Sequence, residues 1–432
     1  MNRVFLIIIL IIIFPLIAFS QNVLTVDDAV SLALKNNYDI LVAQNNVSID
    51  EINNTPGNAG MLPNIAITGS NSYYPGSNTN QKFLDGTTSS SNSKSNSLIA
   101  NAGLTWTLFD GGKMFVTKRK LSEIQELGEI EFKDRVMQTV YYVILAYYDV
   151  VRQKQQLASI NEVITYNLDR VKISQTAYNA GLSPKTNLLQ AKIDLNVYQE
   201  NAINQQSVII AAKRTLNQFL GRGADVPFEV LDSIPLNYKP DNKELFLKLD
   251  SSNTGILASQ KEVNVSKLSV KEMNALLLPK LNFNAGYGLS QSNYSSGTTL
   301  MNRSFGPQIG GSISVPIFQA GNINRQIKTA KLQLQSAEYN LESLKLQTNQ
   351  QLQNALTQFE NQKQLLTIEK DNAVLAKENL EITIQRLRLG QTTSLEVSLA
   401  EGSFVESLTR LIKFEYNLKV AETKLKQLIA GL

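Results

Sequence analysis

The sequence contains no histidine and no cysteine among its 432 residues. These two absences exclude imidazole bases, thiol nucleophiles, disulfides and the commonest metal ligands. The carboxylates that remain are scattered along segments of helical character and do not gather beside glycine-rich loops. We therefore expect no catalytic, cofactor-binding or metal-binding residues and no enzymatic activity.

An excess of one charge is also missing. The chain carries 41 basic and 37 acidic residues, a net charge of +4, and the two signs are interspersed. The single basic cluster, Lys118–Lys120, is interpreted as the solvated start of a helix and not as a phosphate-binding patch. We expect no nucleic-acid partner.

One long hydrophobic run is present, and it lies at the N-terminus. It follows Arg3, spans Val4–Phe19 and contains Pro15, and the small residues Ala18 and Ser20 follow the spacing of a cleavage site. The run has 16 residues (19 − 4 + 1), whereas a membrane-spanning helix needs roughly 20. Residues 1–20 are therefore predicted to be a secretory signal peptide, with an uncleaved membrane anchor as the alternative.

The strongest positive feature is an internal duplication in constant register. Matching residues lie 209 positions apart (318 − 109, 321 − 112, 390 − 181, 400 − 191, 425 − 216). The first set is Phe109, Gly112, Gly181, Ala191 and Leu216, and the second is Phe318, Gly321, Gly390, Ala400 and Leu425. Two copies of one unit are typical of an assembled, pseudo-symmetric protein and not of a pocket enzyme.

Each copy is expected to begin with one helix that ends before a proline. Thr25 is a predicted N-cap, with acidic residues in the first turn of a helix that runs to about Ile52. The counterpart is expected to run from near Asp241 to about Leu277. The dipeptides Leu62-Pro63 and Leu278-Pro279 then mark the entry into strands.

Alternating apolar and polar residues after these prolines predict one β-hairpin in each copy. The alternation is clear at 98–108, 281–290 and 308–317 and weakest at 64–74. The connecting segments, Pro75–Ser97 and Gln291–Arg303, are rich in Ser, Asn, Gly and Thr and are expected to be exposed loops. Strands of about ten residues match a transmembrane β-strand, with aromatics expected near the strand ends. These are Trp106, Tyr73, Tyr74 and Phe305. The alternative for the strands alone is a soluble β-sandwich.

Two very long helices are predicted at about 115–180 and 324–389, because neither segment contains an internal proline. About 65 residues would span roughly 100 Å as a helix. Apolar side chains follow a coiled-coil seam in both segments. In the second copy they are Ala337, Leu341, Leu344, Thr348, Leu352, Ala355, Phe359 and Leu366; in the first they are Val136, Val140, Val143, Tyr147 and Val151.

Both long helices are expected to stop at matching glycines and to restart as return helices that end near Leu220 and Ile429. Each copy therefore contains a helical hairpin whose tip carries a glycine. The segment 222–240, with one glycine and three prolines, is expected to link the copies outside the coiled coil. The predicted organisation is a signal peptide at 1–20, a first repeat at 21–221, a linker at 222–240 and a second repeat at 241–432.

The order of elements resembles the TolC-type outer-membrane efflux proteins over essentially the whole mature chain. The resemblance is carried by the Leu-Pro dipeptides at strand entry, by 108–112 and 317–321 at strand exit, and by the tip segments 178–191 and 386–400. It implies an α+β membrane protein. In this fold a duplicated unit of β-hairpin plus long antiparallel helical hairpin forms a shared trimeric β-barrel and an α-helical periplasmic tunnel.

The resemblance also implies a function. Proteins of this type are passive exit ducts of tripartite efflux or type I secretion systems. They sit as homotrimers in the lipid bilayer of the outer membrane of a Gram-negative bacterium, with the helical part in the periplasm. Their expected partners are a periplasmic adaptor (membrane fusion) protein and an inner-membrane transporter of RND or ABC type.

Two sets of site residues follow from the resemblance. The adaptor is expected to dock on the tips Gly181, Leu182, Ser183 and Pro184, and Gly390, Gln391, Thr392 and Thr393. The periplasmic aperture is expected at Asn187 and Glu396, each six positions after a tip glycine. Asn187 is neutral, which argues against a strongly acidic cation-binding ring. For Glu396 an ordinary solvated helix carboxylate is the alternative.

Two other classes of protein were weighed against the duct. A secreted periplasmic coiled-coil scaffold without a channel would explain the helices but not four amphipathic strands. An enzyme that uses only carboxylates would explain neither feature.

Overall fold

A computed structural model describes residues 23–296 and 299–432. The predicted signal peptide lies outside these described residues. The described residues form two compact units. The helical unit gathers Phe132–Thr254, Leu346–Leu432 and the chain up to Ala43, and the sheet unit gathers Gln44–Glu131 and Gly255–Lys345.

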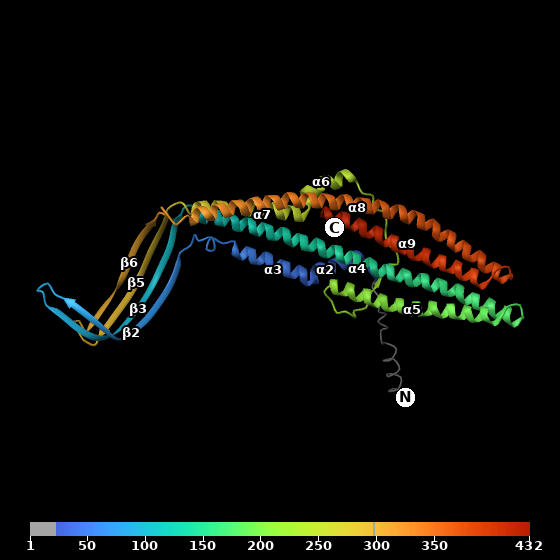
Figure 1. Cartoon of the computed structure of the whole chain (residues 1–432), viewed down its shortest axis with the longest axis horizontal. Helices are drawn as coiled ribbons and strands as arrows, with labels where there is room; N and C mark the ends of the chain where they lie inside the picture. The colour runs from blue at the N-terminus through green and yellow to red at the C-terminus, as the bar shows by residue number, and fades with distance from the viewer. Residues whose placement is uncertain (1–22, 297–298) are drawn as a thin grey trace, which may run out of the picture. The chain divides into compact units, whose positions relative to one another are not determined.

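The two helical hairpins confirm the duplication in detail (Figure 1). Helix α4 (Lys113–Asn179) and helix α8 (Asn322–Arg388) each have 67 residues, and the return helices α5 (Lys185–Phe219) and α9 (Ser394–Leu428) each have 35. All four pairs of boundaries keep the offset of 209 (322 − 113, 388 − 179, 394 − 185, 428 − 219).

The predicted single helix at the start of each copy is wrong, because an asparagine divides it. Helices α2 (Val26–Asn36) and α3 (Tyr38–Asn53) are separated by Asn37, and α6 (Asn242–Ser252) and α7 (Thr254–Ala275) by Asn253. Both asparagines have extended backbone angles. Each side-chain amide donates a hydrogen bond to the last turn of a return helix, Asn37 to the Phe219 carbonyl (2.8 Å) and Asn253 to the Leu428 carbonyl (2.9 Å).

The predicted helix starts are confirmed. Thr25 forms a capping box, in which its side chain accepts from the Asp28 N–H and the Asp28 carboxylate accepts from the Thr25 N–H. Asp241 accepts from the N–H groups of Lys243 and Glu244. These caps satisfy donors that a helix start would otherwise leave unpaired.

The sheet unit holds a four-stranded antiparallel sheet in the order β2-β3-β5-β6. Its strands are β2 (Asn64–Lys82), β3 (Thr88–Asp110), β5 (Lys280–Tyr294) and β6 (Met301–Ser314). The two predicted hairpins are confirmed as β2–β3 and β5–β6, and β3 pairs with β5 to join the copies.

The strand lengths were predicted wrongly. The four strands have 19, 23, 15 and 14 residues, so most of the expected loop residues are paired backbone. Hydrogen bonding along a hairpin depends on register and turn, here the Asp85–Thr87 turn with Gly86 at φ 83°, and not on side-chain hydropathy. Tyr73 and Tyr74 consequently lie in the middle of β2. Strand β6 ends at Ser314 instead of Ile317, because Pro316 has no N–H to donate.

Three clusters of buried side chains hold the helical unit together. The first copy packs α2, α4 and α5 around Tyr147, and the second packs α6, α8 and α9 around Leu352. A third cluster joins the copies through Val163 of α4, Leu380 of α8 and Phe404 of α9. Most members of the predicted seams are buried, including Val143 and Leu352 at 0% exposure.

The linker contributes to the first cluster, which the sequence did not indicate. Phe228, Val230 and Ile234 are buried against α4, and β4 (Glu229–Val230) pairs in parallel with β1 (Val23–Leu24). The hydroxyl of Tyr147 donates to the Leu24 carbonyl at 2.8 Å.

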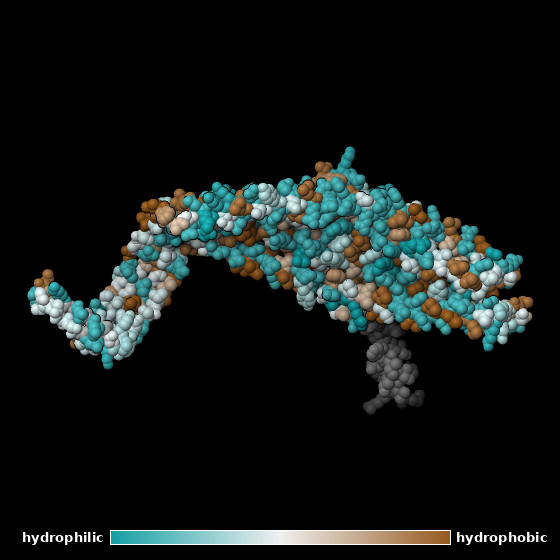
Figure 2. Space-filling model, in the orientation of Figure 1, coloured by the Kyte–Doolittle hydropathy of each residue, from teal (hydrophilic) through white to brown (hydrophobic). Residues whose placement is uncertain are grey.

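Apolar side chains also remain on the surface. The visible face of the helices in Figure 2 is mostly hydrophilic, with hydrophobic residues scattered along it. Within residues 23–296 and 299–432, no helix combines the length and apolar content that a membrane crossing requires.

Candidate functional site at the helical tips

The tips are built by the same backbone turn in both copies. Gly181 (φ 73°) and Gly390 (φ 68°) occupy the left-handed region that favours glycine. Leu182 N–H donates to the Ala177 carbonyl (2.9 Å) and Gly181 N–H to the Tyr178 carbonyl (3.0 Å), which together form a Schellman motif. The residues 209 positions later repeat both hydrogen bonds. The stop-and-restart prediction is confirmed.

The two restarts differ in their caps. Helix α5 begins after Pro184, which has no side-chain cap, whereas α9 begins after Thr393, whose hydroxyl accepts from the Glu396 N–H at 3.3 Å. The hydroxyl of Thr392 also donates to the Glu396 carboxylate. Glu396 therefore stabilises the start of α9, where a negative charge is favourable.

Asn187 has a comparable local role in the first copy. It occupies the position of α5 equivalent to Glu396 (396 − 187 = 209), and its side-chain amide donates to the Ser183 hydroxyl at 3.0 Å. Asn187 is half-buried and Glu396 is exposed. Asn187 and Glu396, the two residues predicted at the aperture, thus each stabilise the turn at their own tip through hydrogen bonds.

A groove of about 750 Å³ lies between the two tips. It is lined by residues of both hairpins and by six of the eight predicted tip residues. The lining comprises Lys172, Ile173, Ser174, Thr176, Ala177, Ala180, Leu182, Ser183, Pro184, Asn187, Leu387, Arg388, Leu389, Gly390, Thr392, Thr393, Ser394 and Leu395. The side chains of Leu182, Leu389 and Leu395 are 83%, 70% and 68% exposed. A groove that combines exposed leucines with polar side chains and the two basic residues Lys172 and Arg388 can bind another protein.

The groove is connected to a buried charge cluster that sequence reasoning missed. Arg170 of α4 is fully buried and lies 2.9 Å from both Asp194 of α5 and Glu401 of α9. Its guanidinium also donates to the hydroxyls of Ser394 and Ser398 at 2.8 Å. One side chain therefore ties three helices of both hairpins together. The sequence did contain one indication of this cluster. Arg170 lies at helical spacing from Val163 and Ser174, which are buried, so its side chain is on the same face of α4.

The cluster places two carboxylates beside one guanidinium. Burial raises the pKa of Glu401 to about 7, and the nearby charge of Asp194 adds to this effect while Arg170 opposes it. Burial likewise raises the pKa of Tyr198, which lies beside these carboxylates. The charge state of Glu401 therefore changes near neutral pH.

Comparisons with known proteins agree with this architecture. The model of the family described as "Outer membrane efflux protein" matches residues 29–222 and 248–431. Among related sequences, the chain is 24% identical to the outer membrane efflux protein BepC of Brucella suis over 73% of this chain and 68% of that protein. It is 22% identical to the outer membrane protein TolC of Escherichia coli over 78% and 70%.

Solved structures show the same fold. The outer-membrane channel OprN superimposes with a TM-score of 0.78 at 15% identity, covering 94% of this chain and 90% of that one. The outer membrane protein VceC of Vibrio cholerae gives 0.75 at 16% identity, covering 94% and 96%.

The fold and the paired tips thus define an outer-membrane channel built from two copies of one unit. The chain belongs to the outer membrane efflux protein family, and it is an exit duct of the outer membrane.

Proposed function

We propose that this protein is the passive outer-membrane component of a tripartite efflux or type I secretion system. It receives substrates from an inner-membrane transporter of RND or ABC type through a periplasmic adaptor. The proposal rests above all on one observation, that each copy pairs a β-hairpin with a 67-residue helix and a 35-residue return helix. The chain has no catalytic role in this proposal.

The proposed assembly is a homotrimer that shares one barrel. Each chain supplies four strands and presents β2 and β6 as the outer strands of its sheet. Unpaired strand edges are costly in lipid, where no water can satisfy them. Three chains joined from β2 to β6 would give 12 strands (3 × 4) without a free edge. The helices then lie in the periplasm.

The apolar face of the sheet is proposed to contact the lipid bilayer. It carries Ile67, Leu104 and Trp106, and the indole N–H of Trp106 donates to the Met61 carbonyl at 2.9 Å. Trp106 is the only tryptophan of the chain. In proteoliposomes, lipids brominated along their acyl chains should quench its fluorescence. Emission that bromination leaves unchanged would place this face away from lipid.

The adaptor is proposed to dock at the tips, through the groove that contains Leu182. We expect Leu182→Asp to abolish export in cells while trimer yield stays normal, because a buried carboxylate without a partner disfavours an apolar contact. Leu247→Asp is the matched control, since Leu247 is also highly exposed, at 78%, and lies on α6. Gly390→Val should distort the second tip, where φ is positive. Normal export by Leu182→Asp and Gly390→Val would refute docking at the tips.

Asn187 and Glu396 are proposed to face the periplasmic aperture as well as to brace the tips. Three copies of Glu396 would place like charges near one axis, where they favour cations. Glu396→Gln should lower cation preference in single-channel recordings. Unchanged selectivity would leave Glu396 with only its capping role.

We propose that the chain matures by a single cleavage. Removal of residues 1–20 as a signal peptide leaves a first repeat at 21–221 and a second at 241–432, connected by 222–240. Mass spectrometry of the purified protein would identify the mature N-terminus.

A further inference from the structure

The sheet has one apolar and one polar face, and the polar face is almost free of charge. Side chains of the polar face include Thr105, Thr107, Asn282, Gln308 and Ser312, as the register of the paired strands shows. Across the register-paired positions of this face, 64–74, 95–107 with 110, 280–294 and 302–314, the charged residues are Lys280 and its cross-strand partner Asp110. Lys280 stands at the first position of β5, where the sheet meets the helices.

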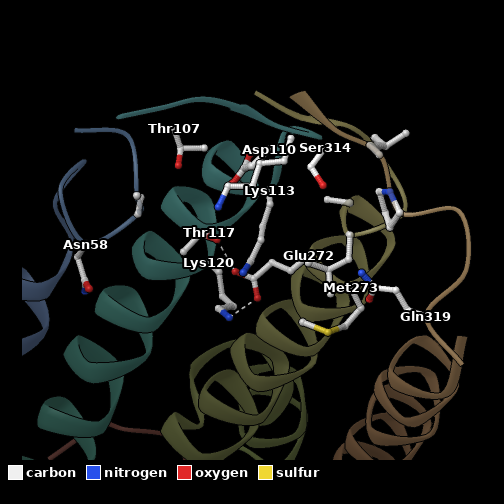
Figure 3. A pocket seen from close by; sticks show the side chains of 17 residues that line it. Asn58, Thr107, Asp110, Lys113, Thr117, Lys120, Glu272, Met273, Ser314 and Gln319 are labelled. Atoms are coloured by element: carbon white, nitrogen blue, oxygen red, sulfur yellow. Dashed lines mark hydrogen bonds and ion pairs between the residues drawn. The ribbon is translucent and has the colours of Figure 1, made fainter. Parts of the chain in front are cut away.

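A cavity of about 600 Å³ opens beside Lys280 (Figure 3). Thr107 and Ser314 of the polar face line its rim, α4 and α7 contribute Lys113, Lys120 and Glu272, and all of its lining residues belong to the sheet unit. Because the rim carries Thr107 and Ser314, the cavity lies on the side of the polar face of the sheet.

The acidic side chains in this cavity are already engaged. The carboxylate of Glu272, which is 4% exposed, accepts from the Thr117 hydroxyl (2.6 Å) and from the Lys120 ammonium. Both carboxylate oxygens of Asp110 accept from the Met114 N–H, at 3.0 and 3.1 Å. These contacts stabilise the two negative charges within the protein.

The lysines are not matched in the same way. The cavity is lined by three lysines and two carboxylates, which leaves a net charge of +1 (3 − 2). Within the described residues, no carboxylate lies within ion-pair distance of Lys113 or Lys280. Figure 3 shows the Lys113 side chain pointing into the cavity, toward Glu272. Lys280 is the cross-strand partner of Asp110, whose carboxylate accepts from the Met114 N–H, so each ammonium group lies near a carboxylate that already has another donor.

The turn next to the cavity is tightly packed. Gly111 has φ 74°, and a Cβ at this position would overlap the Ala275 carbonyl and the Leu278 side chain. The turn after β3 is therefore packed directly on the end of α7. The packing fixes the backbone from which Lys113 extends, while the two lysine side chains lose rotamer freedom when they bind an anion.

We propose that this cavity is an oxyanion-binding site on the aqueous side of the duct, with Lys113 and Lys280 as its binding residues. The ligand class is a small molecule with a phosphate or carboxylate group, held by charge-assisted hydrogen bonds from the two ammonium groups. This proposal rests on the proposed function, because the site would hold anions that pass through the duct. The site lies where the strands join the helices of the sheet unit.

The direct test is calorimetric titration of the purified full-length protein with inorganic pyrophosphate at low ionic strength. We expect saturable binding that weakens at least about tenfold in the double variant Lys113→Gln/Lys280→Gln and falls steeply with added salt. Lys271→Gln is the matched control, because Lys271 lies on α7 next to Glu272, is exposed and is not part of the cavity lining. Tricarballylate in place of pyrophosphate tests whether carboxylates bind as phosphates do.

Binding to wild type and to Lys271→Gln, with loss in the double variant, supports the site. Absence of saturable binding to wild type, or equal binding by the double variant, overturns it. Single-channel recording of the same preparations separates this result from the proposed function. A conducting protein that does not bind pyrophosphate refutes only the anion site, whereas binding without conductance refutes the duct and leaves the site standing.

Discussion

The helical hairpins of the two copies have the same helix lengths but different chemistry at equivalent positions. Arg170, Asp194 and Glu401 form a buried charge cluster, whereas the positions related to them by 209 are Asn379, Ser403 and Lys192. Asn379 and Lys192 are exposed. The duplication therefore preserves helix lengths and tip turns, while the side chains make the two hairpins non-equivalent. Helix geometry depends on hydrogen bonds that many sequences can make, but a buried ion pair depends on particular residues.

The largest expected effect comes from breaking the buried cluster. Arg170→Met should destabilise the helical unit by about 3–5 kcal/mol, because Asp194 and Glu401 would lose their shared cation inside the protein. Asn379→Met is the matched change in the second copy and should have little effect on an exposed site. Circular dichroism melting of both variants in detergent measures the difference. Equal melting temperatures for the two variants would contradict a stabilising role of the buried cluster that only the Arg170 position has.

The pH dependence of stability tests the same cluster without removing the arginine. Burial raises the pKa of Glu401 from its ordinary 4.5 to about 7. The folded state then binds the proton more tightly than the unfolded state, so this contribution to stability is complete below about pH 4.5 and is lost as pH rises through about 7. The loss amounts to about 3 kcal/mol.

Glu401→Gln should flatten this part of the profile, because a neutral amide does not titrate. Melting temperatures of wild type and variant between pH 4.5 and 7 provide the measurement. Parallel profiles would show that Glu401 is ionised throughout this range.

Glycine positions give a third contrast between the copies. Gly221 (φ 64°) corresponds to Ala430 (φ 51°), and a Cβ on Gly221 would overlap the backbone of Asn36. Gly221→Ala should cost about 3 kcal/mol, from left-handed strain plus the overlap. Ala430→Gly should stabilise by about 1 kcal/mol, because it relieves the strain alone. Thermal melting measures both effects. The melting temperature should fall in Gly221→Ala and rise in Ala430→Gly, and changes in the same direction would contradict this account.

The smallest effects should come from the two asparagines that divide the first helices of the copies. Asn37→Ala and Asn253→Ala each remove one hydrogen bond to the last turn of a return helix, which should cost about 1 kcal/mol. Asn37→Ala also removes the cap that the Asn37 side chain provides to the Asp39 N–H, and it should therefore cost about 1 kcal/mol more. The bonds are equivalent even though the asparagines lie 216 positions apart (253 − 37) and their acceptors 209 (428 − 219). An unchanged melting temperature in either variant would contradict a stabilising role for its hydrogen bond to the return helix.

The sequence predicts this fold wherever the signal is local. Helix caps at Thr25 and Asp241, tip glycines and the apolar seams all depend on neighbouring residues, and the structure confirms them. The breaks at Asn37 and Asn253 could not be predicted from neighbouring residues alone, because each side-chain amide donates to an acceptor at least 175 positions away, although Asn37 also caps α3 locally by accepting from the Asp39 N–H. The extra strand length depends in the same manner on partner strands.

Some features of the candidate site can likewise be predicted from local sequence, and others depend on tertiary packing. The tip residues follow from the glycine stops, and the groove that they line requires the two hairpins to be adjacent, which only tertiary packing provides. Arg170 looks like one polar residue in a long helix until Glu401, 231 positions later, is placed against it.

Assembly of the duct from three copies is the central claim, and the edges of the sheet test it most directly. The chain has no native cysteine. In a scan that places one cysteine in β2 and one in β6, every disulfide therefore forms between introduced cysteines. Oxidation in the membrane should give covalently linked species up to a trimer for pairs in register. Only monomers at every pair, from protein whose sheet signal is intact, would contradict the shared assembly.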